Sequence, residues 1–296
     1  MRVLLIGANG QLGFELWRNL QLQQEVVPTT RDGSEISGMN TLGLDLTDAT
    51  DIELKLKNIK PDIICNAAAF TAVDAAEAEQ EQARLINTEA VDKLSHYAKL
   101  HESLLIHYST DYVFSGQGED AWTEKDETGP LSVYGQTKLA GEEAIIKSGC
   151  EFLILRTAWV FAERGHNFLR TMLRLAQERD EISVVNDQAG TPTWAHTLAV
   201  ATAAALYLPQ TGIYHVTNAG STTWFGFAKH IFEQAEKIGL LERQPKLTPI
   251  ATDAYPTAAP RPKNSVLNCE KFEKIFNVKL PHWTTALQLC MQRMKP

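Results

Sequence analysis

Cysteine is scarce in this chain of 296 residues, which has only Cys65, Cys150, Cys269 and Cys290. Their spacing contains no CxxC pair or other pattern typical of a metal site, so we expect free thiols in a reducing compartment. Long apolar runs are also missing. The run at residues 3–6 leads directly into a glycine loop and is too short for a membrane span or a signal peptide. The sequence therefore predicts a cytoplasmic protein with no membrane segment.

Positive charge is in deficit, with 28 Lys and Arg against 36 Asp and Glu and a formal net charge of -8. Such a balance argues against a protein that holds nucleic acid by neutralising many phosphates. An anionic ligand would have to be bound by locally placed basic groups or helix N-termini. Low-complexity tracts and internal repeats are absent as well, and 44% hydrophobic residues is an ordinary value for a globular protein.

The first half of the chain alternates short apolar strands with helical stretches. Runs such as Ile63-Ile64-Cys65 are continuously apolar, as expected of strands covered on both faces. This pattern predicts an α/β fold with a Rossmann doubly wound parallel sheet. We expect strands at residues 3–6, 25–28, 41–46, 62–66, 104–108 and 152–157, and helices at 13–22, 83–100 and 132–147.

The alternation weakens after about residue 165, where we expect a smaller C-terminal α/β substrate-binding domain. The predicted boundaries are 1–165 for the NAD(P)-binding Rossmann domain, with a return segment at about 192–218, and 166–296 for mainly the second domain. Helices are expected at 167–179, 195–208, 224–238 and 284–294, with a loop at 187–193. The irregular Pro-rich stretch 245–262 predicts an ordered binding loop more than a linker.

Three glycines follow the first predicted strand in a GxxGxxG pattern: Gly7, Gly10 and Gly13. Glycines at this place allow a tight turn, close approach of the backbone to a pyrophosphate, and anion binding at a helix N-terminus. The competing interpretation is that they merely shape a turn. Their position between the first strand and the first helix favours a dinucleotide site.

The end of the second predicted strand bears on the choice of coenzyme. Thr30 and Arg31 favour NADPH, because an arginine there accommodates the 2′-phosphate, whereas an acidic residue bonds the 2′-hydroxyl of NADH. Asp32 could be that acid if the strand ended later. Asp45, followed by Leu46, fits a contact with the adenine amino group or a helix N-cap before Ala49, and both could hold.

Tyr134 and Lys138 form a YxxxK pattern at the start of a predicted helix. This spacing places both side chains on one face, where the ammonium can lower the pKa of the phenol and bind the nicotinamide ribose. The alternative is a core aromatic residue beside a solvated lysine. A strand some 25 residues earlier ends in residues 107–112, HYSTDY, and brings hydroxyl groups to the ligand-binding edge of the sheet. Thr110 could therefore bond a reacting carbonyl oxygen together with Tyr134.

Together these motifs resemble the extended short-chain dehydrogenase/reductase superfamily, which the NAAA run at 66–69 and YGxTK at 134–138 also suggest. Within it, further blocks are similar to the dTDP-4-dehydrorhamnose reductase family and span almost the whole chain in order. They are residues 66–74, 156–160, 186–188 with 190 and 192–193, and 261–262 with 264–265.

The resemblance implies hydride transfer from NAD(P)H to C4 of dTDP-4-dehydro-β-L-rhamnose. Tyr134 would donate the proton, Lys138 would tune it and orient the ribose, and Thr110 would polarise the carbonyl. The residues that would line the coenzyme are Gly7, Gly10, Gln11, Leu12, Gly13, Thr30, Arg31, Asp45, Leu46, Ala69, Phe70, Thr71 and Lys138. Those that would contact the nucleotide sugar are Thr110, Asp111, Trp159, Asn167 and Arg261. A core role for Trp159 and a plain surface role for Arg261 stay open.

The chain departs from the family at two places. Some members carry an acidic residue where Thr30 stands, so their use of NADH is not assumed here; NADPH is preferred and NADH stays open. Some dimerise around Mg²⁺ held by carboxylates, and Glu15 matches one of these, but His196 replaces another. Because Mg²⁺ prefers oxygen ligands, we expect no metal-bridged dimer, and monomer and homodimer both remain open.

Two other functions compete with this one. An epimerase or 4,6-dehydratase of another nucleotide sugar would share the scaffold, but a dehydratase commonly has an Asp-Glu pair after the threonine, and Thr110 is followed by Asp111-Tyr112. A non-catalytic NADP-binding regulatory subunit, like the reductase-like subunit of methionine adenosyltransferase, would also share it. The intact Thr110, Tyr134 and Lys138 favour catalysis.

Overall fold

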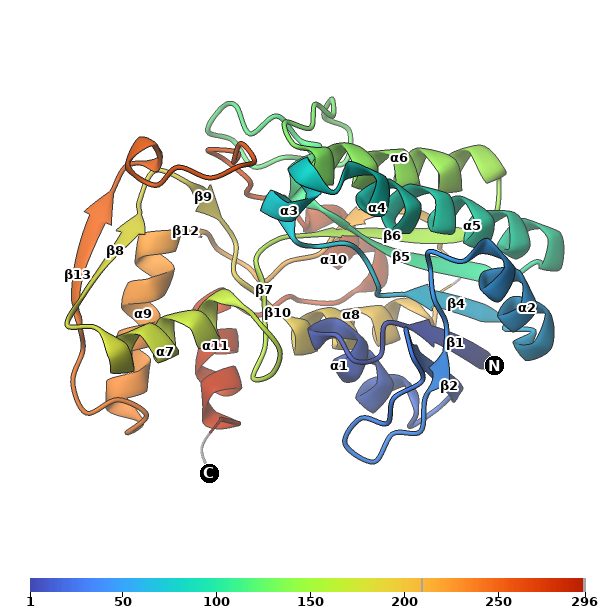
Figure 1. The fold of residues 1–296 in the computed structure, drawn as a ribbon, viewed down its shortest axis with the longest axis horizontal. Coiled ribbons are helices and arrows are strands. Elements are labelled where there is room, and N and C mark those ends of the chain that lie inside the picture. The colour runs from blue at the N-terminus through green and yellow to red at the C-terminus, as the bar shows by residue number, and fades with distance from the viewer. Residues whose placement is uncertain (209, 295–296) are drawn as a thin grey trace.

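The computed structural model describes residues 1–208 and 210–294, and its centre is a seven-stranded parallel sheet (Figure 1). The strand order is β11-β6-β5-β4-β1-β2-β3. The order reverses between β1 and β4, and ligands of doubly wound sheets bind at the carboxyl ends of such strands. The α/β doubly wound parallel fold is thus confirmed. The strands are β1 Arg2–Ile6, β2 Glu25–Thr30, β3 Leu42–Gly43, β4 Ile63–Asn66, β5 Leu104–Thr110, β6 Phe152–Thr157 and β11 Gly212–His215.

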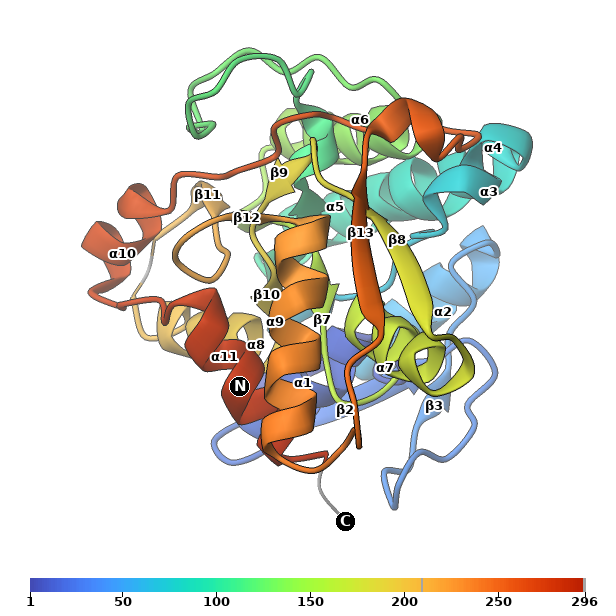
Figure 2. The same ribbon diagram turned by 90° about the vertical axis from the view of Figure 1, so that its left-hand side faces the viewer.

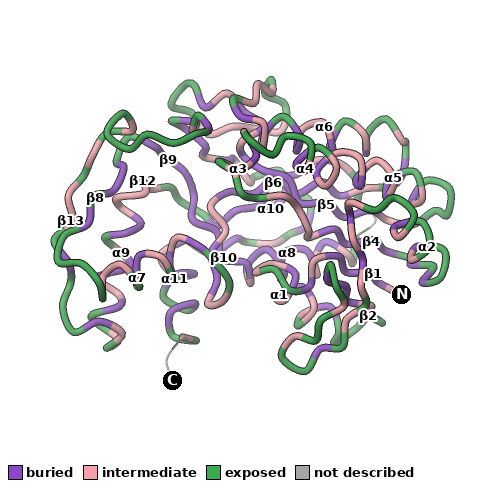
Figure 3. Tube along the Cα trace, viewed as in Figure 1, coloured by how far each residue is buried: buried purple, intermediate pink, exposed green. Residues whose placement is uncertain are grey.

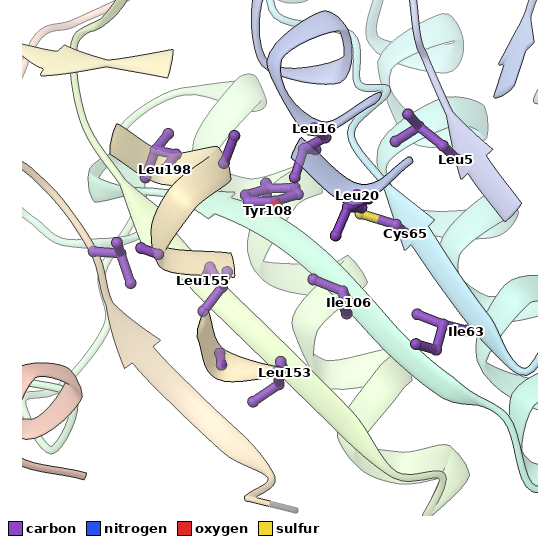
Figure 4. Close-up of a cluster of buried hydrophobic side chains, with 14 of the residues drawn as sticks. Leu5, Leu16, Leu20, Ile63, Cys65, Ile106, Tyr108, Leu153, Leu155 and Leu198 are labelled. Atoms are coloured by element: carbon purple, nitrogen blue, oxygen red, sulfur yellow. The ribbon is translucent and has the colours of Figure 1, made fainter. Parts of the chain in front are cut away.

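Both faces of this sheet are buried, which explains the continuously apolar strands. Side chains alternate between two cores, so that in β1 Leu5 enters one and Leu4 the other. Figure 4 shows the first core, in which Tyr108 and Cys65 lie among leucines and isoleucines. Helices α1 Gln11–Leu20 and α8 Ala195–Ala205 cover that face, and α2 Ala49–Ile59, α5 Ala90–His101 and α6 Val133–Ser148 cover the other (Figure 1).

Helix boundaries follow local capping chemistry. Ser132 caps α6 by accepting a hydrogen bond from Gly135 N, and Asp48 caps α2. Asp45 is therefore not the N-cap that the sequence allowed. The single helix predicted over 83–100 is interrupted: α4 Gln80–Arg84 is followed by a π-helical turn, η1 Leu85–Glu89, before α5 begins. The helix predicted from Gly13 begins two residues earlier.

The rest of the chain packs around a separate apolar core between α7 Phe168–Glu178, α9 Trp224–Lys237 and α11 Trp283–Gln292. Strands β8 Glu181–Val185 and β13 Lys246–Ile250 pair in parallel beside α9 (Figure 2). The expectation that 245–262 is irregular was wrong at its start, since β13 lies there. Shorter elements are α3 Val73–Ala78, η2 Asp111–Val113, β7 Val160–Phe161, β9 Ala189–Gly190, β10 Thr193–Trp194, β12 Thr222–Thr223, η3 Thr252–Ala254 and α10 Glu270–Phe276.

Burial concentrates in the central sheet and on the facing sides of α9 and α11, and the outer helix faces are exposed (Figure 3). Strand β11 and helix α8 return to the central sheet layer late in the chain. The division into domains at about residue 165 stays a prediction. Across residues 1–208 and 210–294, no helix has the length and apolar character that crossing a membrane requires.

Candidate active site

The glycine turn packs too tightly to accept a larger residue. Gly7 has a φ of +83°, and a Cβ there would lie 2.9 Å from Ala68 N. A Cβ on Gly13 would lie 2.0 Å from the Gly7 carbonyl oxygen. Because Gly10 at the N-cap of α1 has no side chain, a phosphate can approach the backbone N–H groups of the first helical turn. The residues that form this turn, Gln11 and Leu12 included, fit a pyrophosphate cradle.

The predicted coenzyme-selecting residues lie together at the carboxyl ends of β2 and β3. Thr30 Oγ1 lies 3.3 Å from Asp32 Oδ1, and Arg31 Nε donates to Asp45 Oδ2 at 3.0 Å. Partial burial raises the pKa of Asp45, but hydrogen bonds from Thr47 and Arg31 outweigh it and hold that pKa below its ordinary value. Arg31 is 70% exposed, so its guanidinium can turn to an added phosphate. Leu46, in contrast, is buried in the sheet core.

The predicted segment Ala69, Phe70 and Thr71 follows β4 and is held in place by a residue that sequence reasoning missed. Asn87, in the π-helical turn η1, accepts from Phe70 N at 2.9 Å and donates to Phe70 O at 3.1 Å. The same amide donates to Thr137 Oγ1 at 3.2 Å. Asn87 therefore connects this segment to α6. No sequence pattern indicated this role, because a π-helical turn has no local sequence signature.

Thr110 ends β5 and Tyr134 stands in the first turn of α6. Helix α6 starts close to the segment that follows β5. A Cβ on Gly135 would lie 2.3 Å from Tyr112 O, so only glycine fits at this place. The Thr110 hydroxyl donates to Asp111 Oδ1 at 2.8 Å. Burial raises the pKa of Tyr134 to about 12, with Thr110 opposing the shift. The phenol is therefore protonated at neutral pH and can act as a proton donor.

Lys138 lies one turn further along α6 and is 1% exposed. Its Nζ donates to Tyr108 O at 2.6 Å and lies 3.0 Å from His107 Nε2. Burial lowers the pKa of Lys138 to about 8, although the neighbouring Glu142 opposes this shift. Thr110, Tyr134 and Lys138 are thus brought together at one edge of the sheet.

Asp111 is buried beside this group, and burial raises its pKa to about 6 despite the hydrogen bond from Thr110. Because the pKa of the unfolded carboxyl is near 3.9, its protonation favours the folded state below about pH 4, and this contribution is lost as pH rises through 6. We expect Asp111→Asn to raise the free energy of unfolding at pH 8 by about 1–3 kcal/mol. The gain should vanish near pH 4, which urea unfolding at both pH values can check. Equal gains at both pH values would contradict the ionisation argument.

Trp159 has a φ of +46°, and its indole ring packs on protein groups. The Trp224 ring stacks on it at 3.5 Å with an angle of 8° between the planes, and a Cβ on Gly190 would lie 2.4 Å from its ring. The sequence motifs did not indicate that Trp224 and Gly190 contact the ring of Trp159. Trp159 remains half-buried, so its sugar contact stays a prediction.

Asn167 and Arg261 are engaged by the protein itself. Asn167 caps α7 through Arg170 N and donates to Gln11 Oε1 at 2.8 Å, so it links α7 to the glycine turn. Arg261 donates to Asp74 Oδ2 at 2.7 Å and is 17% exposed. This ion pair holds the Pro-rich stretch against α3. The nucleotide contacts expected of both residues stay predictions.

The carboxylate of Glu15 is held by cations and a histidine. Oε2 lies 2.7 Å from His196 Nδ1 and 3.6 Å from Arg293, and Oε1 accepts from Arg18 at 3.0 Å. Burial raises the pKa of Glu15, but His196 and Arg18 outweigh it and lower that pKa. In the described part of the chain, no group of three or more His, Cys, Asp or Glu could hold a metal ion.

A doubly wound sheet with a glycine cradle after β1, and a Thr-Tyr-Lys group at its carboxyl edge, defines an NAD(P)-dependent oxidoreductase of the short-chain dehydrogenase/reductase class. The family model described as RmlD substrate binding domain matches residues 1–295. The dTDP-4-dehydrorhamnose reductases of Burkholderia thailandensis and Escherichia coli strain K12 are each 44% identical, over 99% of this chain and 98% of the relative. The chain belongs to the dTDP-4-dehydrorhamnose reductase family.

Solved structures agree with this assignment. A dTDP-4-dehydrorhamnose reductase from Bacillus anthracis, in complex with NADP, superposes with a TM-score of 0.90 at 33% identity and 99% coverage of both chains. A UDP-glucose 4-epimerase from Thermus thermophilus, in complex with NAD, reaches 0.85 at 18% identity and 99% coverage of both chains. The second likeness shows the shared fold alone.

Proposed function

We propose that this protein reduces the C4 keto group of dTDP-4-dehydro-β-L-rhamnose to give dTDP-L-rhamnose, with NADPH as the coenzyme. The observation that carries the proposal is the protonated phenol of the half-buried Tyr134 near Thr110 at the carboxyl edge of the sheet. The family supports the substrate, because relatives of nearly equal length carry this activity in their names. The NADP complex of the Bacillus anthracis relative supports the coenzyme.

Each side chain has a distinct part in the reaction. NADPH, when bound, supplies the hydride. Tyr134 gives its proton to the carbonyl oxygen as negative charge develops there, and Thr110 stabilises the same oxygen through its hydroxyl group. The positive charge of Lys138 favours the phenolate that remains. Asp111 and Trp159 border the place of the sugar.

The glycine turn supports the coenzyme site, because the space beside Gly7 and Gly13 excludes even a methyl group. The diphosphate would lie against the backbone from Gly10 to Leu12 at the start of α1. The adenosine end would lie toward Thr30 and Arg31, and the segment Ala69–Thr71 would border the nicotinamide side.

The direct test supplies enzymatically prepared dTDP-4-dehydrorhamnose to the purified chain. Oxidation of NADPH and of NADH is followed separately by the absorbance of the reduced nicotinamide. We expect consumption of one equivalent of NADPH for each sugar reduced, with dTDP-L-rhamnose identified by mass spectrometry and NMR. Binding of NADPH without turnover of this sugar would instead favour a non-catalytic subunit.

Arg31 provides a test of coenzyme choice. Arg31→Ala should raise KM for NADPH about tenfold, the size of one charge-assisted contact in a solvent-exposed place, and leave KM for NADH nearly unchanged. The matched control is Asp32→Ala, which should leave KM for NADPH within about twofold. If Asp32→Ala weakens NADH binding and Arg31→Ala changes neither constant, the acidic residue selects the coenzyme and the assignment is wrong.

The proposal includes a cytoplasmic location. It rests on the four thiols, which are all free in the described structure and of which three are buried. Burial raises the pKa of Cys65 to about 12, so this thiol is inert. Whether the chain acts as a monomer or as a homodimer is a question for sedimentation in solution, with and without EDTA.

A further inference from the structure

Two buried polar residues behind Lys138 have no part in the reaction described above. His107 in β5 is fully buried, and Asn66 at the end of β4 is 1% exposed. The register of the parallel pair places them side by side. Asn66 Nδ2 lies 3.3 Å from His107 Nδ1, and Lys138 Nζ lies 3.0 Å from His107 Nε2. The three side chains form an uninterrupted hydrogen-bonded row from the sheet to α6.

The orientation of the Asn66 amide decides which nitrogen of His107 carries the proton. Ala68 N donates to Asn66 Oδ1 at 3.2 Å, so the NH₂ group of Asn66 faces His107 Nδ1. A ring nitrogen that receives a hydrogen bond cannot carry a hydrogen in that direction. Burial and the Lys138 charge hold the pKa of His107 well below its ordinary value, so the ring is neutral. Its proton therefore lies on Nε2, the nitrogen that faces Lys138.

This tautomer acts differently on the two forms of the lysine. A neutral amine can accept the His107 Nε2–H and still donate to Tyr108 O. An ammonium has no lone pair, so it meets the N–H of His107 without a hydrogen bond and with unfavourable electrostatics. The row thus stabilises the amine relative to the ammonium.

We propose that Asn66 and His107 are positioning residues that set the proton affinity of Lys138, and with it the pH range over which Lys138 carries the positive charge that the reaction uses. The proposal rests on the proposed reductase function.

Other charges around Lys138 act on it as well. On its own helix, Tyr134 precedes it and Glu142 follows it, and Glu142 favours the ammonium. From β6, Arg156 is bonded to Glu142 at 2.6 Å and weakens that influence. From the segment after β5, Asp111 lies beside Tyr134. Burial outweighs Glu142, so the pKa of Lys138 stays below its ordinary value.

The first experiment reads the tautomer in the unmodified protein without any turnover. A long-range proton–nitrogen NMR correlation spectrum of histidine-labelled protein distinguishes Nδ1–H from Nε2–H rings, and His107→Gln assigns the signal. We expect His107 to stay neutral with its proton on Nε2 from pH 8 down to pH 5. A proton on Nδ1, or a charged ring at pH 6, would overturn the proposal.

The second experiment follows kcat against pH. In the wild type, kcat should fall as pH rises through about 8, the pKa to which burial lowers Lys138. In Asn66→Ala, His107 can move its proton to Nδ1 and accept a hydrogen bond from the ammonium. The pH at which kcat falls on the alkaline side, here called the alkaline limb, should therefore rise by about one unit. His107→Gln should shift it in the same direction, because its amide oxygen can accept from Lys138. Unshifted limbs in both variants would contradict the proposal.

Asn218→Ala is the matched control. Asn218 is buried to a similar degree, accepts from Trp194 N at 2.8 Å and donates to Pro281 O at 2.9 Å. Its loss should cost stability and leave the alkaline limb in place, which separates proton affinity from general damage. A chain with the Nε2 tautomer and no reductase activity would contradict the proposed function but support the positioning of Lys138.

Discussion

Tyr134→Phe is expected to lower kcat by roughly 10² to 10⁴, the usual contribution of general acid catalysis. The variant keeps the ring that packs at the start of α6 and removes the one hydroxyl that can protonate the keto oxygen. Thr110 cannot replace it, because an aliphatic hydroxyl is a far weaker acid than a phenol. Turnover is measured by NADPH oxidation with saturating keto sugar, and NADPH affinity by fluorescence titration should stay nearly unchanged.

Tyr108→Phe is the control for this experiment. Tyr108 lies two residues before Thr110 in β5, and its hydroxyl bonds Thr202 Oγ1 at 2.7 Å on the opposite side of the sheet. Removal of that hydroxyl should reduce stability by about 1 kcal/mol and change kcat by no more than a few-fold. An unchanged rate in Tyr134→Phe would remove Tyr134 from the mechanism, whatever the control does.

Glu142→Leu is expected to lower the free energy of unfolding by about 3–5 kcal/mol, because it leaves a buried arginine without its counter-charge. Arg156 Nε donates to Glu142 Oε1 at 3.0 Å, and Arg156 Nη2 donates to Oε2 at 2.6 Å. Their side chains are 4% and 1% exposed, so water cannot replace the lost partner. Urea unfolding followed by circular dichroism measures the loss.

The double variant Glu142→Leu/Arg156→Met should recover most of this stability, because apolar residues often replace a buried ion pair without loss. The exposed pair Arg174–Glu178 on α7 offers the opposite comparison, and Arg174→Ala should cost less than about 1 kcal/mol. A double variant as unstable as Glu142→Leu alone would show that the loss comes from packing in α6 and not from the unpaired charge.

Much of the fold was predictable because local patterns encode it. Continuously apolar strands require cover on both faces, so the run at 63–65 already indicates a parallel sheet with two helical layers. The glycines at 10 and 13 are explained by contacts with the Gly7 backbone within one βα turn. The YxxxK pair needs only helical geometry. These features depend on neighbours within about ten residues, which is the range over which periodicity and turn chemistry act.

Such local patterns could not predict the pairing of β8 with β13. Residues 245–250 contain two prolines and precede a Pro-rich stretch, so they read as irregular. They form a strand because β8, more than 60 residues earlier, provides a parallel partner and α9 covers the pair. A strand at the edge of a small sheet tolerates proline, because its outward N–H groups need no partner.

The sequence by itself determined the class of sheet, and it predicted the place of the coenzyme turn and Thr110, Tyr134 and Lys138 as the candidate reacting group. Only the tertiary structure decided what surrounds them: Asn87 beside Phe70, Trp224 on Trp159, Asp45 on Arg31, and His107 behind Lys138. The reason is physical. Helix and strand periods act between near neighbours, but burial and hydrogen bonds that tune a side chain come from residues that folding brings together from distant parts of the chain.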